Sequence, residues 1–145
     1  EPEATFCTCF GAPFLPLPPT VYARLLAQRI VKHNTDVFLV NTGWSGGPYG
    51  IGERINLDYT RAMVRAAVSG SLKDVSYQRH PIFHVLMPTN CPGVPAEILD
   101  PAATWADKGS YQEAALKLAQ RFRENMKNFA VPDDILAAEP GAGEN

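Results

Sequence analysis

The most distinctive stretch of the sequence is a loop from Asn41 to Arg54 with five glycines between positions 43 and 52. Glycine allows positive φ angles and lets the backbone approach a ligand closely. The Arg54 guanidinium could stack on a planar ring and donate several hydrogen bonds, and the Thr60 hydroxyl could bind a ring edge. The residues alone leave two interpretations open: a ligand-binding loop, or a turn beside a solvated arginine and a capping threonine.

Two phosphate-binding motifs do not fit this loop. Gly47 and Gly52 have the spacing of a P-loop, but Glu53 follows where lysine is needed, and a carboxylate there repels phosphate. Gly50 and Gly52 begin a dinucleotide-binding fingerprint, but Ile55 stands where the third small residue belongs. Neither motif is therefore present.

Other residues of chemical interest favour structural roles. His80 and His84 are separated by a proline, which disfavours a helix, and on a strand they would lie too far apart to share one metal ion easily. Cys7, Cys9 and Cys91 could supply three thiolates, but they lack a fourth ligand and the usual zinc spacing. No Ser-His-Asp or Cys-His arrangement stands out. We therefore expect core or surface histidines, reduced thiols, no metal site and no catalytic residue.

The composition describes one loop-rich segment over residues 1–145. The chain is 46% hydrophobic and 19% charged, which argues against wholesale disorder, and its 13 prolines and 11 glycines indicate many loops. A net charge of −2 leaves no basic field for nucleic acid, and no apolar run is long enough to span a membrane. Three cysteines without a secretory signal predict reduced thiols in the cytoplasm.

Three elements flank the glycine-rich loop. Helical spacing of apolar residues predicts a helix over 20–33, and the short apolar run within 36–41 predicts a strand covered on both faces. A second helix is expected from position 58 or 59 to Ser69, with Gly70 as its C-terminal stop. The loop then lies at the C-terminal end of a strand, where ligands collect in open α/β sheets.

The second half of the chain contains one long helix. Residues 76–87 are expected to be two extended pieces, and residues 88–101 a rigid, irregular loop. Ser110 begins a capping box, followed by one apolar stripe of Ala115, Leu118, Ala119, Phe122, Met126 and Phe129. Asp133 and Asp134 are expected to cap a short helix. Residues 130–145 are expected to form a mobile tail.

Six segments carry a resemblance to a known family. They are 9–17 (CFGAPFLPL), 39–44 (LVNTGW), 46–52 (GGPYGIG), 59–63 (YTRAM), 91–95 (CPGVP) and 98–101 (ILDP). In this order they are very similar to ATP-dependent phosphoenolpyruvate carboxykinase, and the resemblance extends over about 4–129. That family converts oxaloacetate and ATP into phosphoenolpyruvate, ADP and carbon dioxide in gluconeogenesis, with Mg²⁺ and Mn²⁺ as metal ions.

The resemblance implies a part of such an enzyme. The family's P-loop and its Lys, His and Asp metal ligands match no segment here, so we expect the C-terminal portion of its nucleotide-binding catalytic domain. The fold class implied is α/β (mixed α+β), with about three main helices on a small sheet. The rest of the parent polypeptide is then the principal partner. The alternative is a non-catalytic nucleotide-binding or interaction module that keeps the family motifs.

The nucleotide contacts implied by the resemblance are Arg54, Ile55 and Thr60, which in the family hold the adenosine end of ATP. Three positions depart from the family pattern: Glu53 stands where Lys is common, Pro18 where His is frequent, and Cys7 where Ser is frequent. The glutamate removes a positive charge beside the nucleotide. The resemblance therefore predicts ATP binding at this loop, without catalytic or metal-binding residues in the chain.

Overall fold

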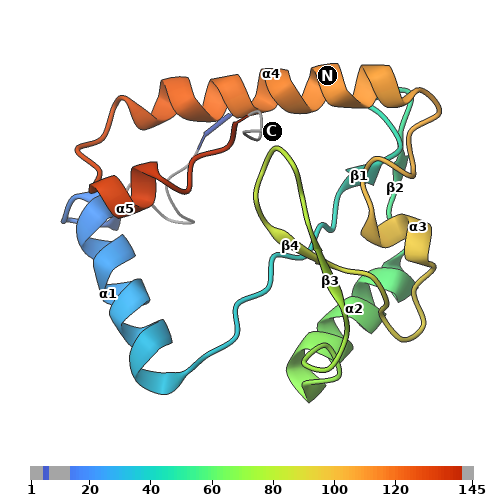
Figure 1. The fold of residues 1–145 in the computed structure, drawn as a ribbon, viewed down its shortest axis with the longest axis horizontal. Helices are drawn as coiled ribbons and strands as arrows, with labels where there is room; N and C mark the ends of the chain where they lie inside the picture. The colour runs from blue at the N-terminus through green and yellow to red at the C-terminus, as the bar shows by residue number, and fades with distance from the viewer. Residues whose placement is uncertain (1–4, 7–13, 142–145) are drawn as a thin grey trace.

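The computed structural model describes residues 5–6 and 14–141 and contains helices and strands in mixed order (Figure 1). Its helices are α1 (Pro19–His33), α2 (Leu57–Ser69), α3 (Ala96–Leu99), α4 (Lys108–Met126) and α5 (Asp133–Leu136). Its strands are β1 (Trp44–Ser45), β2 (Glu53–Arg54), β3 (Tyr77–Arg79) and β4 (Leu86–Pro88). The predicted mixed α+β class is confirmed. The strands form two separate antiparallel pairs, β1 with β2 and β3 with β4, in place of one small sheet.

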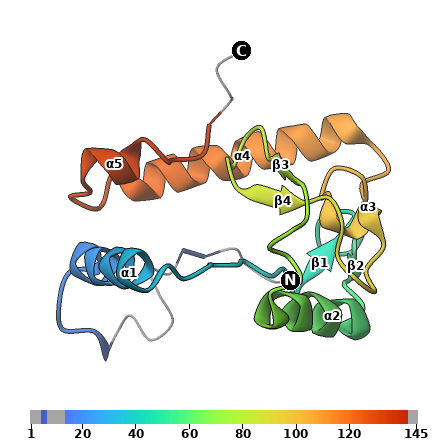
Figure 2. The ribbon, with the colours of Figure 1, turned by 60° about the horizontal axis from the view of Figure 1, so that its bottom comes forward.

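The elements are spread along α4, the longest helix. Figure 1 shows α1 and α5 near one end, and the β1–β2 pair with α2 and α3 toward the other. In Figure 2, α4 and α5 form one layer, α1 and α2 lie in another, and the strands lie between them. The β1–β2 pair thus lies beside elements from both halves of the sequence.

The first two long helices form where the apolar spacing predicted them. α1 ends at Asn34, which has a φ of 47°, and α2 ends at Gly70, which has a φ of 77°. These left-handed residues let the final amides bond to the last helical carbonyls, the usual way in which a helix is closed. Both helix predictions, including Gly70 as the stop, are confirmed.

The strand predicted over 36–41 does not form. The segment is extended, but no strand pairs with it in the described part of the chain, and the side chains of Val37 and Leu39 are 61% and 87% exposed. Phe38 alone packs against the apolar cluster beside α2. A strand needs a neighbouring ladder of backbone partners, and the described residues supply none. The apolar run is typical of a strand that is covered on both faces, but the described residues do not cover both faces of this segment.

Two predicted helix caps are corrected. α4 begins at Lys108, and its N-cap is Asp107, whose carboxylate accepts hydrogen bonds from the Ser110 backbone at 2.8 Å and from the Ser110 hydroxyl. A carboxylate is a stronger acceptor than a hydroxyl, so the helix starts upstream of the expected capping box. Asp133 and Asp134 lie in the first turn of α5, where negative charge favours the helix dipole, and form no cap.

The buried core consists of two small clusters. One contains Ala66, Leu72, Cys91 and Val94, between α2 and the segment before α3. The other contains Ile82, Ala115 and Ala119, where the tip of the β3–β4 hairpin meets α4. The predicted α4 stripe is buried only at its alanines, since Leu118 and Phe122 are 39% and 41% exposed. Residues 88–101, expected to be irregular, contain α3 and an isolated bridge between Cys91 and Val94.

The C-terminal residues contact the rest of the structure. The Gly141 backbone N–H donates to the Ile82 carbonyl at 2.9 Å, and Arg123 Nη1 donates to the Pro140 carbonyl at 2.9 Å. The mobility expected for 130–145 stays a prediction. Within the described ranges, no helix combines the length and apolar character needed to cross a membrane.

Candidate functional site

The glycine-rich loop forms the turn of the β1–β2 hairpin. Trp44 pairs with Arg54 and Ser45 with Glu53, so the loop returns directly to the start of β2. The turn is so tight that a Cβ on Gly52 would lie 2.7 Å from the Ser45 carbonyl oxygen. Real Cβ atoms do not approach an oxygen this closely, so the residue at this position must be glycine for the hairpin to close.

The base of the hairpin is fixed by local hydrogen bonds. The Asn41 side chain accepts from the Gly43 backbone at 2.9 Å and donates to the Trp44 carbonyl at 3.2 Å. The Ile55 N–H donates to the Gly43 carbonyl at 2.9 Å. Above this base, the Trp44 and Tyr49 rings meet edge to face with centroids 5.5 Å apart. These contacts give the hairpin a defined shape.

A turn from the far side of the sequence also supports the hairpin. The Ser45 hydroxyl donates to Thr104 Oγ1 at 2.9 Å, and Thr104 Oγ1 donates to the Pro101 carbonyl at 2.9 Å. The two hydroxyl-bearing residues are 59 positions apart. Their pairing was not predicted, because no local pattern relates residues at such a separation.

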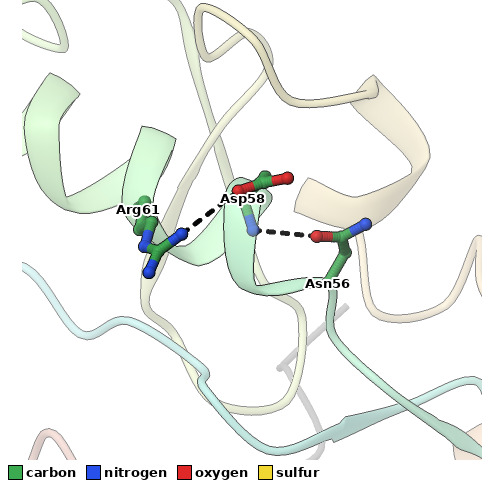
Figure 3. Close-up of polar contacts among 3 residues, drawn as sticks. All are labelled: Asn56, Asp58 and Arg61. Atoms are coloured by element: carbon green, nitrogen blue, oxygen red, sulfur yellow. Dashed lines mark hydrogen bonds and ion pairs between the residues drawn. The ribbon is translucent and has the colours of Figure 1, made fainter.

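The start of α2 continues directly from the hairpin (Figure 3). Asn56 is the N-cap, and its Oδ1 accepts from the Asp58 backbone N–H at 2.8 Å. The Asp58 carboxylate lies 3.4 Å from Arg61 Nη1, which gives this arginine a partner on its own helix. Sequence reasoning missed the cap, although asparagine is among the residues most favoured there. The cap fixes the direction in which α2 leaves the hairpin.

The three expected nucleotide contacts lie around this junction. Arg54 is the last residue of β2, is exposed, and forms no ion pair or side-chain hydrogen bond with other described residues. Ile55 follows it and is half-buried. Thr60 lies in α2, where its N–H donates to the Asn56 carbonyl at 3.1 Å and its hydroxyl has no partner among the described residues. The fold places all three on one connection without joining their side chains.

This arrangement can bind but carries no reacting group. An unpaired guanidinium and an unpaired hydroxyl can hydrogen-bond to a polar ring or sugar, and a half-buried isoleucine can contact its face. Among the residues described, no group of three His, Cys, Asp or Glu side chains could hold a metal ion. The described residues therefore do not fit a Mg²⁺ or Mn²⁺ site.

His80 is a core residue away from the hairpin. It is 4% exposed, its Nδ1 accepts from the Ile82 and Phe83 backbone N–H groups at 3.1 Å each, and its Nε2 lies 2.6 Å from the Tyr111 hydroxyl oxygen. Because Nδ1 accepts two hydrogen bonds, the ring is neutral and Nε2 carries the proton. Burial lowers the pKa of His80, against an opposing effect of Asp100. His80 is thus the structural histidine that was expected.

The cysteines offer no ligand set in the described chain. Cys91 is a buried free thiol, and burial raises its pKa. A thiol with a raised pKa forms less thiolate and is less reactive. Cys7 and Cys9 lie outside the described residues.

The chain is similar to known proteins over most of its length. The family model described as phosphoenolpyruvate carboxykinase, in its ATP-dependent form, matches residues 1–97. The phosphoenolpyruvate carboxykinase (ATP) of Caldanaerobacter subterraneus subsp. tengcongensis is 60% identical over 97% of this chain and 27% of that protein. The enzymes of the same name from Geobacillus kaustophilus and Thermus thermophilus are 58% and 53% identical, over 94% and 97% of this chain and 26% and 27% of their own lengths.

These matches extend through the hairpin and α2. The family-model match includes the glycine-rich loop, Arg54, Ile55 and Thr60. The chain spans about 27% of the length of the curated relatives that it matches. It belongs to the ATP-dependent phosphoenolpyruvate carboxykinase family.

Proposed function

We propose that this chain is the C-terminal portion of an ATP-dependent phosphoenolpyruvate carboxykinase. The complete enzyme would convert oxaloacetate and ATP into phosphoenolpyruvate, ADP and carbon dioxide in the cytoplasm, as a step of gluconeogenesis. The family match over 1–97 and relatives named for this activity support the proposal. The observation that carries it is the family's glycine-rich hairpin, which ends at an arginine without a partner in the described structure.

The role proposed for this chain is to position the adenosine end of ATP. Arg54 would donate to the nucleoside or stack on it, Ile55 would contact its apolar face, and the Thr60 hydroxyl would complete the polar contacts. Orientation of this kind lowers the barrier by holding the reactant in place. It does not itself break or form bonds.

The reacting groups are proposed to come from the rest of the polypeptide. The described residues do not fit a metal site, and the chain covers about a quarter of the length of its relatives. The ligands for Mg²⁺ and Mn²⁺ and the groups that handle oxaloacetate and the transferred phosphoryl would therefore lie outside the 145 residues. The isolated chain is expected to show no carboxykinase turnover.

The experiment uses the complete parent protein and the isolated chain side by side. The complete protein is supplied with oxaloacetate, ATP, Mg²⁺ and Mn²⁺, and the formation of phosphoenolpyruvate, ADP and carbon dioxide is measured. Turnover by the complete protein alone supports the proposal. Tight ATP binding without turnover by the complete protein would favour the non-catalytic module instead, and turnover by the isolated chain would refute the proposed division of roles.

A further inference from the structure

We propose that Thr104 is a positioning residue for the nucleotide. Its hydroxyl holds the glycine-rich hairpin in the orientation that presents Arg54 to the adenosine end of ATP. This inference rests on the proposed function, since it concerns the same binding site. Thr104 is expected to make no contact with ATP itself and to act through Ser45.

The first support is a relay of hydroxyl groups. The Ser45 hydroxyl donates to Thr104 Oγ1 at 2.9 Å, so the Thr104 proton is directed to the Pro101 carbonyl, also at 2.9 Å. Ser45 and Thr104 are both half-buried, where a neutral hydrogen bond competes less with water than at the surface. Thr104 therefore serves as acceptor and donor at once, and replacing its hydroxyl breaks both bonds.

The second support is an independent backbone contact at the next residue. Gly46 has a φ of +81°, and a Cβ placed on it would lie 3.1 Å from the Thr104 carbonyl oxygen. The backbone of the loop thus rests directly against the backbone of Thr104. Side-chain and main-chain contacts at adjacent positions restrict both sliding and rotation of β1 on this turn.

The turn that carries Thr104 is itself well anchored. The Asp100 side chain accepts from the Ala102 N–H at 3.0 Å, and the Asp100 carbonyl accepts from the Ala103 N–H at 3.0 Å. The following residue, Trp105, meets the Tyr111 ring of α4 with centroids 5.7 Å apart. A fixed turn tied to the longest helix is a suitable support for a hairpin made largely of glycine.

The hairpin register connects this anchor to the site. Ser45 pairs with Glu53, and the neighbouring pair joins Trp44 to Arg54. A shift of Ser45 away from Thr104 is therefore transmitted across the two-stranded ladder to the residue beside Arg54. Small displacements of a positioning group are enough to weaken binding, because the binding geometry must be held closely.

The test replaces Thr104 in the complete enzyme. Thr104→Val keeps the shape of the side chain and removes the hydroxyl, and it is expected to raise the KM for ATP by about two- to tenfold, the effect of losing a neutral hydrogen bond. The kcat and the KM for oxaloacetate are expected to change little. Thr104→Ser restores the hydroxyl and is expected to restore the KM for ATP.

A matched control is available on the other hairpin. The Thr89 hydroxyl donates to the Ser76 carbonyl at 3.1 Å, so Thr89→Val also removes a hydroxyl that bonds to a carbonyl. It is expected to leave the KM for ATP unchanged. An equal increase in the KM for ATP in Thr89→Val and Thr104→Val would overturn the positioning role. A fall in the kcat and the melting temperature of Thr104→Val without a change in its KM for ATP would overturn it as well.

Arg54→Ala separates this inference from the function on which it rests. If Arg54→Ala raises the KM for ATP and Thr104→Val does not, the positioning role is overturned while the proposed function stands. If Arg54→Ala has no effect on the KM for ATP, the adenosine site itself is refuted. Thr104 acts through the hairpin that carries Arg54. Thr104→Val is therefore expected to raise the KM for ATP by a smaller factor in the Arg54→Ala enzyme than in the wild type. Full additivity would contradict the inference.

Discussion

Replacing His80 by alanine is expected to loosen the β3–β4 hairpin from α4. The change removes the acceptor of the Ile82 and Phe83 N–H groups, at 3.1 Å each, and the partner of the Tyr111 hydroxyl at 2.6 Å. Ile82 is 6% exposed, so water cannot readily replace its lost acceptor. A buried polar group left without a partner costs about 1–3 kcal/mol. With the smaller cost at the half-buried Phe83, we expect a loss of about 2–4 kcal/mol in local stability.

Hydrogen exchange of the complete protein measures this loss directly. Amide exchange reports the free energy of local opening, so peptides covering 77–88 should exchange about 30- to 1,000-fold faster in His80→Ala. His33→Ala is the control, because His33 is an exposed histidine in the last turn of α1. An acceleration in 77–88 of less than about threefold would refute the view that His80 fixes this hairpin.

The same site predicts how stability depends on pH. Burial lowers the pKa of His80 in the folded state, while Asp100 opposes the shift and His84 adds to it. The folded state therefore binds fewer protons than the unfolded state, whose histidine pKa is about 6.5. The contribution of His80 to the free energy of unfolding is fully present above that pH and is lost as the pH falls through the pKa of His80 in the folded state. Protection of 77–88 that increases on acidification, after correction for intrinsic exchange, would contradict this sign.

Two further predictions concern the loop and α4. Gly52→Ala would place a Cβ 2.7 Å from the Ser45 carbonyl oxygen, which the hairpin cannot accommodate without moving. Gly50 has a φ of +87°, but a Cβ placed on it would have no atom within 4 Å. Gly50→Ala therefore costs only about 1–2 kcal/mol of backbone strain. In the complete enzyme, Gly52→Ala should therefore raise the KM for ATP more than Gly50→Ala, and the reverse order would refute the observed hairpin. Asp107→Ala should speed amide exchange at Gly109 and Ser110, and Asp107→Asn should largely restore protection; no change on loss of the carboxylate would show that it does not cap α4.

The elements predicted correctly depend on neighbouring residues. The periodicity of α1 and α2 reflects helical geometry, and their stops at Asn34 and Gly70 are local choices of residues that tolerate left-handed φ. Asp107 and Ser110 are both of a type favoured at the N-cap and lie within one turn of each other. The N-cap observed for α4 is Asp107. Local sequence patterns predict the presence of a helix more reliably than they predict its first residue.

The features missed depend on distant partners. Residues 36–41 have the composition of a buried strand, but a strand forms only when another segment supplies the ladder, and none of the described residues does so. The bond between Ser45 and Thr104 joins positions 59 apart and leaves no periodic trace in the sequence. Arg54, Ile55 and Thr60 stay predicted nucleotide contacts that rest on the resemblance, whereas the hairpin and the cap beside them could be described only from the three-dimensional structure.

The most direct test of the adenosine site compares two ligands on the complete protein. Equilibrium dissociation constants are measured for ATP and for inorganic tripolyphosphate, which lacks the nucleoside, with the wild type, Arg54→Ala and the control Arg79→Ala, an exposed arginine of β3. A charge-assisted hydrogen bond contributes about 1.5–3 kcal/mol, so Arg54→Ala should weaken ATP binding about tenfold or more. Tripolyphosphate binding should be unchanged, as should ATP binding to Arg79→Ala. Equal weakening of both ligands by Arg54→Ala, or no weakening of ATP binding, would contradict the assignment of this loop to the adenosine end of the nucleotide.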